Sequence, residues 1–357
     1  MSWEDNVRRV EPYTPGEQTK NPDIIKLNTN ECPYPPSPKV VQMAREMDIE
    51  KLRLYPDPKV TDLNEAWAEY CHLQPNQVFS GVGSDDVLAI AFLTFFYGKK
   101  PILFPDITYS FYDVWADLFR IPFATKALDE QFKLRKEDYF GENGGVVIAN
   151  PNAPTGEEAD LAEIEDIIRH NPDSVVIVDE AYVDFGAQSA IPLIDKYENL
   201  LVVQTFSKSW ALAGLRIGFA MGNKKLIRYM NDVKFSFNSY TMNTTAIRLG
   251  TAAIHDATYM HKVVAKTMDT RERVKPLLRE IGFTLGDSKS NFVFVSHRSV
   301  PASELFQMLR EHDILVRYFS KPERISNYLR ISIGTDEQMD RLLKVLREYL
   351  KIDNAKV

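Results

Sequence analysis

Residues 200–216 read LLVVQTFSKSWALAGLR, and this stretch decides the fold. It opens with an apolar run over 200–204, which predicts a buried strand. Polar residues follow where that strand ends, among them Lys208 and, eight residues later, Arg216. Such an arrangement is typical of an open α/β sheet, in which ligands bind beyond the carboxyl ends of the strands.

Apolar runs and helical patterns alternate along the chain around this stretch. Further strands are predicted at 101–104, 146–149, 175–178 and 217–221, and helices at 61–71, 85–97, 109–119, 161–170 and 224–233. Uniformly apolar strands that alternate with helices indicate a mainly parallel sheet covered by helices on both faces. We therefore expect an α/β fold with a large domain of this kind.

The last third of the chain has a different pattern. After a long helical region, about 241–281, strands are predicted at 291–296 and 328–333, and helices at 302–312 and 336–351. This pattern predicts a smaller α+β domain. The first 60 residues are rich in proline, which predicts an extended arm that joins the smaller domain or a dimer interface. The expected boundaries are 1–40 for the arm, 41–265 for the large domain and 266–357 for the small domain.

The composition excludes several classes of protein. The chain has 357 residues, of which 44% are hydrophobic and 26% are charged, as in an ordinary globular protein. Its net charge of -7 argues against a general affinity for nucleic acid or for an anionic membrane. The longest apolar stretch, 87–97, is too short to span a bilayer, and the N-terminus does not have the pattern of a secretory signal.

Cysteine and histidine usage argues against a metal site. Cys32 and Cys71 form no CxxC spacing, and the six histidines form no HxxxH or HExxH pair. We expect no metal. The two cysteines are those of a cytoplasmic protein with reduced thiols, so we expect a cytoplasmic location.

The residues that follow the predicted strands are weak signals one by one. A lysine such as Lys208 is usually a solvated surface charge, Asp179 is more often a helix cap or ion-pair partner, and Arg216 could form a structural salt bridge. The glycines of Gly81-Val82-Gly83 could form a simple turn. They fail the dinucleotide fingerprint because Asp86 replaces the third glycine, which argues against an NAD-dependent dehydrogenase.

Taken together, these residues suit pyridoxal 5'-phosphate. Lys208 can supply the amine that forms a Schiff base with the cofactor's aldehyde. Asp179 can hold the pyridine nitrogen protonated, so that the ring accepts electrons from a substrate carbanion. Tyr182 follows three residues later, and its hydroxyl can donate to the phenolic oxygen of the ring.

The cofactor's phosphate requires free backbone N–H groups at the start of a helix and a cation that makes two hydrogen bonds. Ser84 and Asp85 begin a predicted helix, while Thr205, Ser207 and Arg216 can complete the phosphate site. Asp85 is then expected to turn its carboxylate away from the phosphate and to cap the helix.

The motifs resemble those of the class I/II aminotransferases of fold type I. The similar segments are Asn150–Gly156, Asp179–Tyr182, Ser207–Arg216 and Leu329–Gly334. With Pro12–Gly16 and Leu27–Glu31 added, they resemble more narrowly the histidinol-phosphate aminotransferases, along nearly the whole chain. The resemblance implies an aspartate-aminotransferase-like fold and a pyridoxal-phosphate cofactor.

The resemblance also implies roles for residues outside these motifs. Tyr109 should stack on the pyridine ring, although it could instead be a core aromatic residue. Tyr55 should reach across a homodimer interface to the phosphate of the neighbouring subunit's cofactor, so that the active sites are shared. Arg330 should bind the anionic group of the substrate. The candidates that complete the substrate pocket are Tyr13, Asn30, Tyr55 and Arg317, of which Asn30 and Arg317 could equally serve packing of the arm.

One position departs from the family pattern. The family usually reads Asn-Pro-Asn-Asn-Pro-Thr-Gly, and the asparagine before Pro-Thr-Gly bonds the cofactor's phenolic oxygen. Here that position is Ala153. Either Asn152 makes the bond through a shifted loop, or Tyr182 bears more of this interaction.

The activity that the resemblance implies is a ping-pong transamination through Lys208. It would convert L-histidinol phosphate and 2-oxoglutarate to imidazole acetol phosphate and glutamate in histidine biosynthesis. The same framework resembles aromatic amino-acid aminotransferases and a threonine-phosphate decarboxylase, which remain alternatives. A cofactor-binding regulator is disfavoured because the motifs occupy the chain and leave no length for a DNA-binding module.

Overall fold

The computed structural model describes residues 2–352 and contains two sheets. The larger sheet has seven strands in the order β2-β8-β7-β6-β5-β3-β4. Strand β8 runs antiparallel to its neighbours β7 and β2, and the other pairs are parallel. The strands are β2 (Val78–Gly81), β3 (Ile102–Pro105), β4 (Phe123–Lys126), β5 (Gly145–Ala149), β6 (Val176–Asp179), β7 (Leu200–Thr205) and β8 (Gly218–Gly222). The expected mainly parallel sheet is confirmed.

Helices bury both faces of this sheet. Alternate residues of its central strands belong to two separate hydrophobic cores, as Val178 and Val202 do on one side and Ile177 and Val203 on the other. Helices α2 (Thr61–Tyr70), α5 (Leu161–His170) and α7 (Thr244–Ile254) contribute to the first core. Helices α3 (Ser84–Phe95), α4 (Tyr112–Phe119) and α6 (Lys224–Phe237) contribute to the second. Two buried faces explain why the central strands are apolar throughout.

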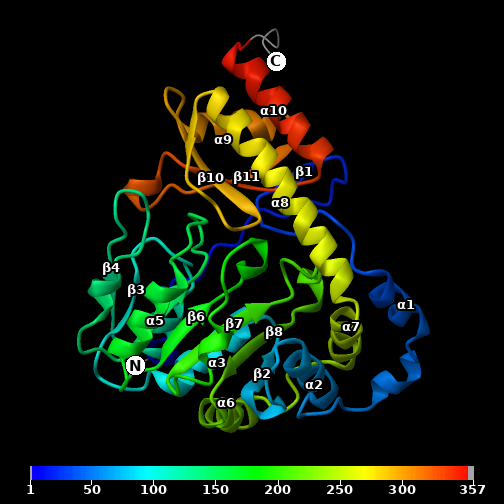
Figure 1. Cartoon of the computed structure of the whole chain (residues 1–357), viewed down its shortest axis with the longest axis vertical. Helices are drawn as coiled ribbons and strands as arrows, with labels where there is room; N and C mark the ends of the chain where they lie inside the picture. The colour runs from blue at the N-terminus through cyan, green and yellow to red at the C-terminus, as the bar shows by residue number, and fades with distance from the viewer. Residues whose placement is uncertain (1, 353–357) are drawn as a thin grey trace.

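The smaller sheet has five strands in the order β1-β11-β12-β10-β9 and a core of its own. Its strands are β1 (Ile25–Leu27), β9 (Phe283–Leu285), β10 (Phe292–His297), β11 (Ile314–Tyr318) and β12 (Leu329–Ser332). Helices α9 (Ala302–Glu311) and α10 (Asp336–Leu350) pack with it. In Figure 1 the long helix α8 (Ala257–Glu280) runs from the larger lower part of the molecule into this upper part.

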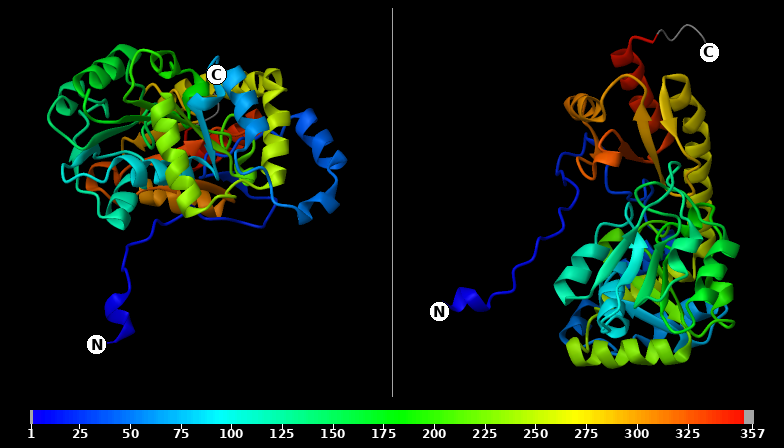
Figure 2. Two further views of the ribbon diagram at one scale, coloured as in Figure 1. Left: turned by 90° about the horizontal axis from the view of Figure 1, so that it is seen from below. Right: turned by 90° about the vertical axis from the view of Figure 1, so that its left-hand side faces the viewer.

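The proline-rich N-terminal region is more structured than we expected. Strand β1 pairs in parallel with β11, so this region joins the smaller sheet. Helix α1 (Pro38–Glu46) follows, with Ser37 as its N-cap and Pro38 at its first position, where proline is well tolerated. A 3₁₀ helix, η2 (Ile49–Arg53), comes next. Figure 2 shows the segment before β1 extending away from the main body.

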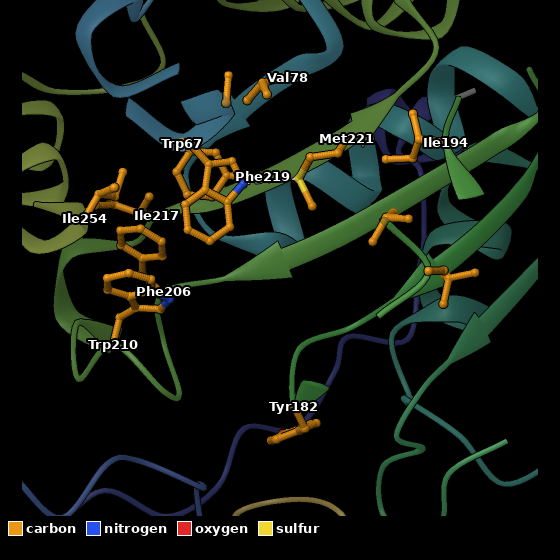
Figure 3. Close-up of a cluster of buried hydrophobic side chains, with 14 of the residues drawn as sticks. Trp67, Val78, Tyr182, Ile194, Phe206, Trp210, Ile217, Phe219, Met221 and Ile254 are labelled. Carbon is orange, nitrogen blue, oxygen red and sulfur yellow. Dashed lines mark hydrogen bonds between the residues drawn. The ribbon is translucent and has the colours of Figure 1, made fainter. Parts of the chain in front are cut away.

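The antiparallel direction of β8 positions the residues of interest. Because β8 runs back along β7, the loop between them returns to the same sheet edge, and Thr205 pairs with Gly218 at its base. Phe206 and Trp210 flank Lys208 in this loop and stack on each other, with ring centroids 4.6 Å apart. Figure 3 shows both rings in the buried cluster that contains Trp67 and Phe219. The loop is therefore anchored in the core on both sides of Lys208.

No helix within residues 2–352 is long and apolar enough to cross a membrane.

Candidate active site

A cavity of about 170 Å³ lies beyond the carboxyl ends of the central strands. Nine of the predicted site residues line it: Ser84, Asp85, Tyr109, Asp179, Tyr182, Thr205, Ser207, Lys208 and Arg216. Thr29 and Glu31, which were named only as part of the segment Leu27–Glu31 and given no role, line it as well. The loops that follow β6 and β7, the start of α3 and the segment after β1 thus meet at one place, as expected for an open α/β sheet.

Lys208 extends its amine into this cavity. Its Nζ donates a hydrogen bond to the main-chain oxygen of Thr29 at 3.2 Å, and lies 5.7 Å from the centroid of the Tyr182 ring. Ser209, the next residue, donates a hydrogen bond to the carboxylate of Asp184. This bond ties the Lys208 loop to the segment that carries Tyr182.

Asp179 ends strand β6 and is buried. Its carboxylate accepts hydrogen bonds from the Tyr112 hydroxyl at 2.8 Å and from the Ala181 N–H at 3.3 Å. Burial raises the pKa of Asp179 to about 6, while the hydrogen bond from Tyr112 acts in the opposite direction. A buried carboxylate of this kind can pair with a protonated ring nitrogen, which would favour its ionised form further.

Tyr182 is buried beside Lys208, and its hydroxyl is held by Asn30. The Asn30 amide donates to the Tyr182 oxygen at 2.9 Å. The Asn30 oxygen accepts a hydrogen bond from Ser332 at 3.0 Å. Asn30 thus lies beneath the tyrosine rather than in the open part of the cavity, and it is only 1% exposed.

The start of α3 lies against Arg216 at Gly83. Gly83 precedes the helix and has no side chain to cap it. Among residues 2–352, no side chain therefore caps the first N–H groups of this helix, and they stay available. Gly83 has φ +86°, and a Cβ at this position would lie 2.5 Å from Nη2 of Arg216. Arg216 also donates to Oγ of Ser207 at 3.2 Å, and the Thr205 hydroxyl donates to the same oxygen at 3.0 Å. A glycine is therefore required where the guanidinium meets the helix.

The expected cap by Asp85 is wrong. Its carboxylate does not turn back onto the helix but accepts hydrogen bonds from Arg216 at 3.0 Å and from the Tyr109 hydroxyl at 2.8 Å. The neighbouring Asp86 takes the local role, because it accepts a hydrogen bond from the Val82 N–H at 2.9 Å. The ion pair with Arg216 gives the Asp85 carboxylate a charge-assisted hydrogen bond.

Tyr109 forms one wall of the cavity. Its ring packs against Phe111 and, edge on, against Tyr112. Burial and the nearby charge of Asp85 raise its pKa well above the ordinary value for tyrosine, so its hydroxyl remains a donor to Asp85. Tyr109 lines the cavity, and its stacking on a flat ligand stays a prediction.

Asn152 does not take the place of the asparagine missing at position 153. Its amide donates to the Ile107 main-chain oxygen at 2.9 Å and to the Thr155 hydroxyl at 3.0 Å, and its oxygen accepts from Thr108 at 2.8 Å. These hydrogen bonds hold the loop together and use both amide hydrogens of Asn152. Pro151 and Ala153, on either side of it, line the cavity. The interpretation of Asn152 as a cofactor contact is therefore corrected.

Arg330 approaches from strand β12 of the smaller sheet. Its Nη2 donates to the main-chain oxygen of Asn28 at 3.2 Å, and its guanidinium lies 5.4 Å from the ring centroid of Phe292. Its Nε is buried without a hydrogen-bond partner among residues 2–352. Burial lowers the pKa of Arg330. Arg330 is half-buried as a whole, and a guanidinium with a buried, unused donor is suited to bind an anion.

Tyr13 and Arg317 lie in the N-terminal arm and on β11. Tyr13 stacks on Phe111 with ring centroids 4.2 Å apart. Arg317 pairs with Arg330 across the β11–β12 ladder, and its Nη2 donates to the main-chain oxygen of Thr14 at 3.2 Å. The arm therefore runs past both the aromatic wall and the arginine pair.

Tyr55 lies outside the cavity of its own chain. It is 82% exposed and stacks on Tyr240, with ring centroids 4.6 Å apart. Exposed apolar side chains of η2 and of the end of α6 accompany it, including Ile49, Leu52 and Phe237.

Within residues 2–352 no group of three or more His, Cys, Asp and Glu side chains is arranged to hold a metal ion.

Comparison with known proteins agrees with this geometry. The sequence matches the family model described as aminotransferase class I and II over residues 22–346. It is 51% identical over 351 residues to the histidinol-phosphate aminotransferase of Lactococcus lactis subsp. cremoris (strain SK11), and the match covers 98% of each chain.

Solved structures have the same fold. The histidinol-phosphate aminotransferase from Clostridium acetobutylicum has a TM-score of 0.85 at 21% identity, covering 92% of this chain and 99% of the other. The enzyme from Sinorhizobium meliloti, in complex with pyridoxal-5'-phosphate, has a TM-score of 0.81 at 23% identity, covering 92% and 91%. The family match spans most of the sequence, and the chain belongs to the class I and II aminotransferases.

Proposed function

We propose that this chain is a pyridoxal-phosphate-dependent aminotransferase that transfers the amino group between L-histidinol phosphate and 2-oxoglutarate. One observation carries the proposal. The Lys208 amine, the Asp179 carboxylate and the Arg216 guanidinium line a single cavity at the strand ends. The relatives that are about 50% identical over the whole chain support the substrate.

The residues present fit the cofactor. The uncapped start of α3, Ser207, Thr205 and Arg216 supply the donors that a phosphate monoester needs. Gly83 has no side chain, so the Arg216 guanidinium can lie close to the start of this helix. At the other end of the cavity, Asp179 is a buried carboxylate suited to a ring nitrogen. Tyr109 and Ala153 line the space between.

When bound, pyridoxal phosphate supplies a ring that takes up the negative charge left when the substrate carbon loses its proton. Lys208 would supply the amine that anchors the cofactor and would accept and return the proton at the substrate carbon. Asp179 would keep a positive charge on the ring nitrogen. Tyr182 would donate to the ring's oxygen, and Arg216 would hold the phosphate. The cycle requires two substrates in turn, which gives ping-pong kinetics.

Arg330 is proposed to bind the anionic group of the substrate. Its unused Nε and planar guanidinium can take either the phosphate ester of histidinol phosphate or the carboxylate of glutamate. Arg317, opposite it in the ladder, and Tyr13 from the arm are proposed to complete this end of the pocket.

The active enzyme is proposed to be a homodimer with shared active sites. Tyr55 and Tyr240 stack on each other, and the neighbouring sequence carries further exposed apolar side chains: Ile49 and Leu52 in η2, and Phe237 at the end of α6. Exposed large apolar side chains of this kind favour a protein interface. Tyr55 would then reach the phosphate site of the neighbouring subunit.

We place the enzyme in the cytoplasm, since Cys32 and Cys71 are both free thiols. We also propose that residues 1–40, 41–265 and 266–357 form the arm, the large domain and the small domain.

The test is a visible-spectrum titration of the protein loaded with pyridoxal phosphate. L-Histidinol phosphate should abolish the absorption band of the lysine-bound cofactor at far lower concentration than phenylalanine does. Equal or better bleaching by phenylalanine would identify an aromatic amino-acid aminotransferase instead. Release of carbon dioxide from O-phosphothreonine without amino transfer would identify a decarboxylase. Failure to form the band after addition of pyridoxal phosphate would overturn the cofactor assignment.

A further inference from the structure

Three buried polar side chains from distant parts of the chain form one network at the cavity. Asn30 follows β1, Ser332 ends β12, and Tyr182 follows β6 of the larger sheet. The hydroxyl of Ser332 accepts a hydrogen bond from the Asn30 main-chain N–H at 2.9 Å and donates to the Asn30 side-chain oxygen at 3.0 Å. The Asn30 amide nitrogen then donates to the Tyr182 oxygen at 2.9 Å.

The directions of these bonds follow from counting protons. A serine hydroxyl has one proton, and Ser332 uses its oxygen as the acceptor for the Asn30 main-chain N–H. The Ser332 proton is therefore given to Oδ1 of Asn30, which leaves the NH₂ group of Asn30 facing Tyr182. An NH₂ group can only donate. The Tyr182 oxygen must accept, and its own proton has to point elsewhere.

The other side of the Tyr182 hydroxyl is the cavity, since Tyr182 lines it beside Lys208. Ala153 has no amide with which to share the task of donating to the cofactor's oxygen. Asn152, the nearest alternative, has its amide committed to Ile107 and Thr155. The phenol proton of Tyr182 is therefore the donor that this region directs toward the ligand.

We propose that Asn30, oriented by Ser332, is a positioning residue that fixes Tyr182 as a hydrogen-bond donor into the cavity. This inference rests on the proposed function and gives Asn30 a role beneath the cofactor site rather than in the substrate pocket. Asn30 and Ser332 belong to the smaller sheet and its flanking segment, whereas Tyr182 belongs to the larger one. The direction of the tyrosine proton thus depends on how the two sheets meet.

The test is the pH midpoint of the visible absorption change in the cofactor-loaded protein. That midpoint reports the proton held at the link between Lys208 and the cofactor. A hydrogen bond donated to the cofactor's oxygen withdraws negative charge that would otherwise hold this proton. Loss of the donor should therefore raise the midpoint, in Tyr182→Phe by about one pH unit or more.

Asn30→Gly and Ser332→Ala are the decisive variants. Glycine tolerates the positive φ of 56° at position 30, so Asn30→Gly removes the amide without straining the backbone. It should raise the midpoint in the same direction as Tyr182→Phe, and Ser332→Ala should raise it less. Asn30→Gly combined with Tyr182→Phe should give no further rise beyond Tyr182→Phe alone, because both changes remove one interaction.

The matched control is Asn28→Gly. Asn28 is also a buried asparagine in this segment, but its amide donates to the Glu17 main-chain oxygen. It should leave the midpoint at the wild-type value. If Asn30→Gly and Ser332→Ala leave the midpoint unchanged while Tyr182→Phe shifts it, or if the shifts of Asn30→Gly and Tyr182→Phe add, the inference is wrong. If Asn30→Gly does not fold, Ser332→Ala alone decides. A wild-type protein without any visible band would instead overturn the proposed function.

Discussion

The hydroxyl of Tyr112 donates a hydrogen bond to Oδ2 of Asp179 at a distance of 2.8 Å, deep within the second core of the larger sheet. Tyr112 is fully buried, and burial together with the neighbouring carboxylate raises its pKa well above the ordinary value. Its hydroxyl is therefore protonated near neutral pH and remains a donor to Asp179. Asp179 is held in one orientation by a residue that never reaches the cavity.

Replacement of Tyr112 by phenylalanine should destabilise the ionised form of Asp179 and so raise the pKa of this carboxyl group. The lost hydrogen bond to a buried charge corresponds to about 1.5 kcal/mol, or roughly one pH unit. The acidic limb of the profile of kcat against pH should move upward by about that amount, and cofactor affinity near neutral pH should fall. Tyr139→Phe is the matched control, because Tyr139 is equally buried but lies in the other core. An unchanged acidic limb in Tyr112→Phe would exclude the role.

Replacement of Asp179 by asparagine should stabilise the cofactor-free protein above pH 6. Burial raises the pKa of Asp179 from an ordinary value near 4 to about 6. The folded-state pKa of this acid is higher than its unfolded-state pKa. The protonated group therefore contributes its full stability below the unfolded-state pKa, and this contribution is lost as the pH rises through 6. At pH 8 the ionised carboxylate thus costs up to roughly 3 kcal/mol, which asparagine avoids.

Urea unfolding of the cofactor-free proteins measures this difference. The free energy of unfolding should be higher for Asp179→Asn than for wild type by roughly 1–3 kcal/mol at pH 8, and the gap should narrow toward pH 5. Transamination by the variant should be lost. A variant less stable than wild type at pH 8 would show that the hydrogen bonds of the carboxylate outweigh its burial.

Asp85 competes with the phosphate for Arg216. The two side chains form an ion pair at 3.0 Å inside the proposed phosphate site, and both are about two-fifths exposed. Asp85→Asn removes a negative charge from the site, so inorganic phosphate should bind the cofactor-free protein about three- to tenfold more tightly. Calorimetric titration measures this affinity.

The control for this prediction is the adjacent Asp86→Asn. Asp86 accepts the hydrogen bond of the Val82 N–H and does not pair with Arg216. It should change phosphate affinity less than Asp85→Asn does. Weaker binding by Asp85→Asn would mean that its hydrogen bond from Tyr109 matters more than its charge.

Mixing two defective proteins tests whether the active sites are shared. Lys208→Ala should be inactive, and Tyr55→Ala should bind the cofactor's phosphate weakly. If Tyr55 serves the neighbouring subunit, each mixed dimer has one intact site, and random exchange should restore about one quarter of wild-type activity. If Tyr55 acts within its own chain, mixing restores nothing.

Tyr97→Ala is the matched control for the mixing experiment. Tyr97 is 95% exposed, follows the end of α3 and is not part of the Tyr55 and Tyr240 stack. Tyr97→Ala alone should be as active as wild type. When Tyr97→Ala is mixed with Lys208→Ala, the activity should equal that of the Tyr97→Ala protein in the mixture and should not rise above it.

Much of the larger sheet could be predicted because its strands are buried on both faces. Strand β7 and helix α5 were predicted to within one residue, since their apolar patterns are long and regular. Strand β4 was missed because it is a short edge strand whose residues alternate between exposed and half-buried positions. Helix α1 was missed because the proline-rich region around it was interpreted as an extended arm, although Pro38 occupies the first helical turn.

The site could be predicted only where its residues follow a strand or begin a helix. Lys208, Asp179 and Arg216 stand in such positions, and they line the predicted cavity. The hydrogen bond between Asn30 and Ser332 joins residues 302 positions apart, and no local pattern carries that information. Tyr112 was assigned to the interior of a helix that in fact begins there, so its contact with Asp179 was not foreseen.

The loop between β7 and β8 has a consequence for how the protein folds. It carries both Lys208 and Arg216, and the pairing of Thr205 with Gly218 closes it after a short span of chain. Closing a short loop costs little conformational entropy compared with joining Asn30 to Ser332. The lysine and arginine can thus be brought together early, before the smaller sheet docks. A nascent chain could then capture its cofactor first, and the ligand would act as a template on which the remainder of the enzyme assembles.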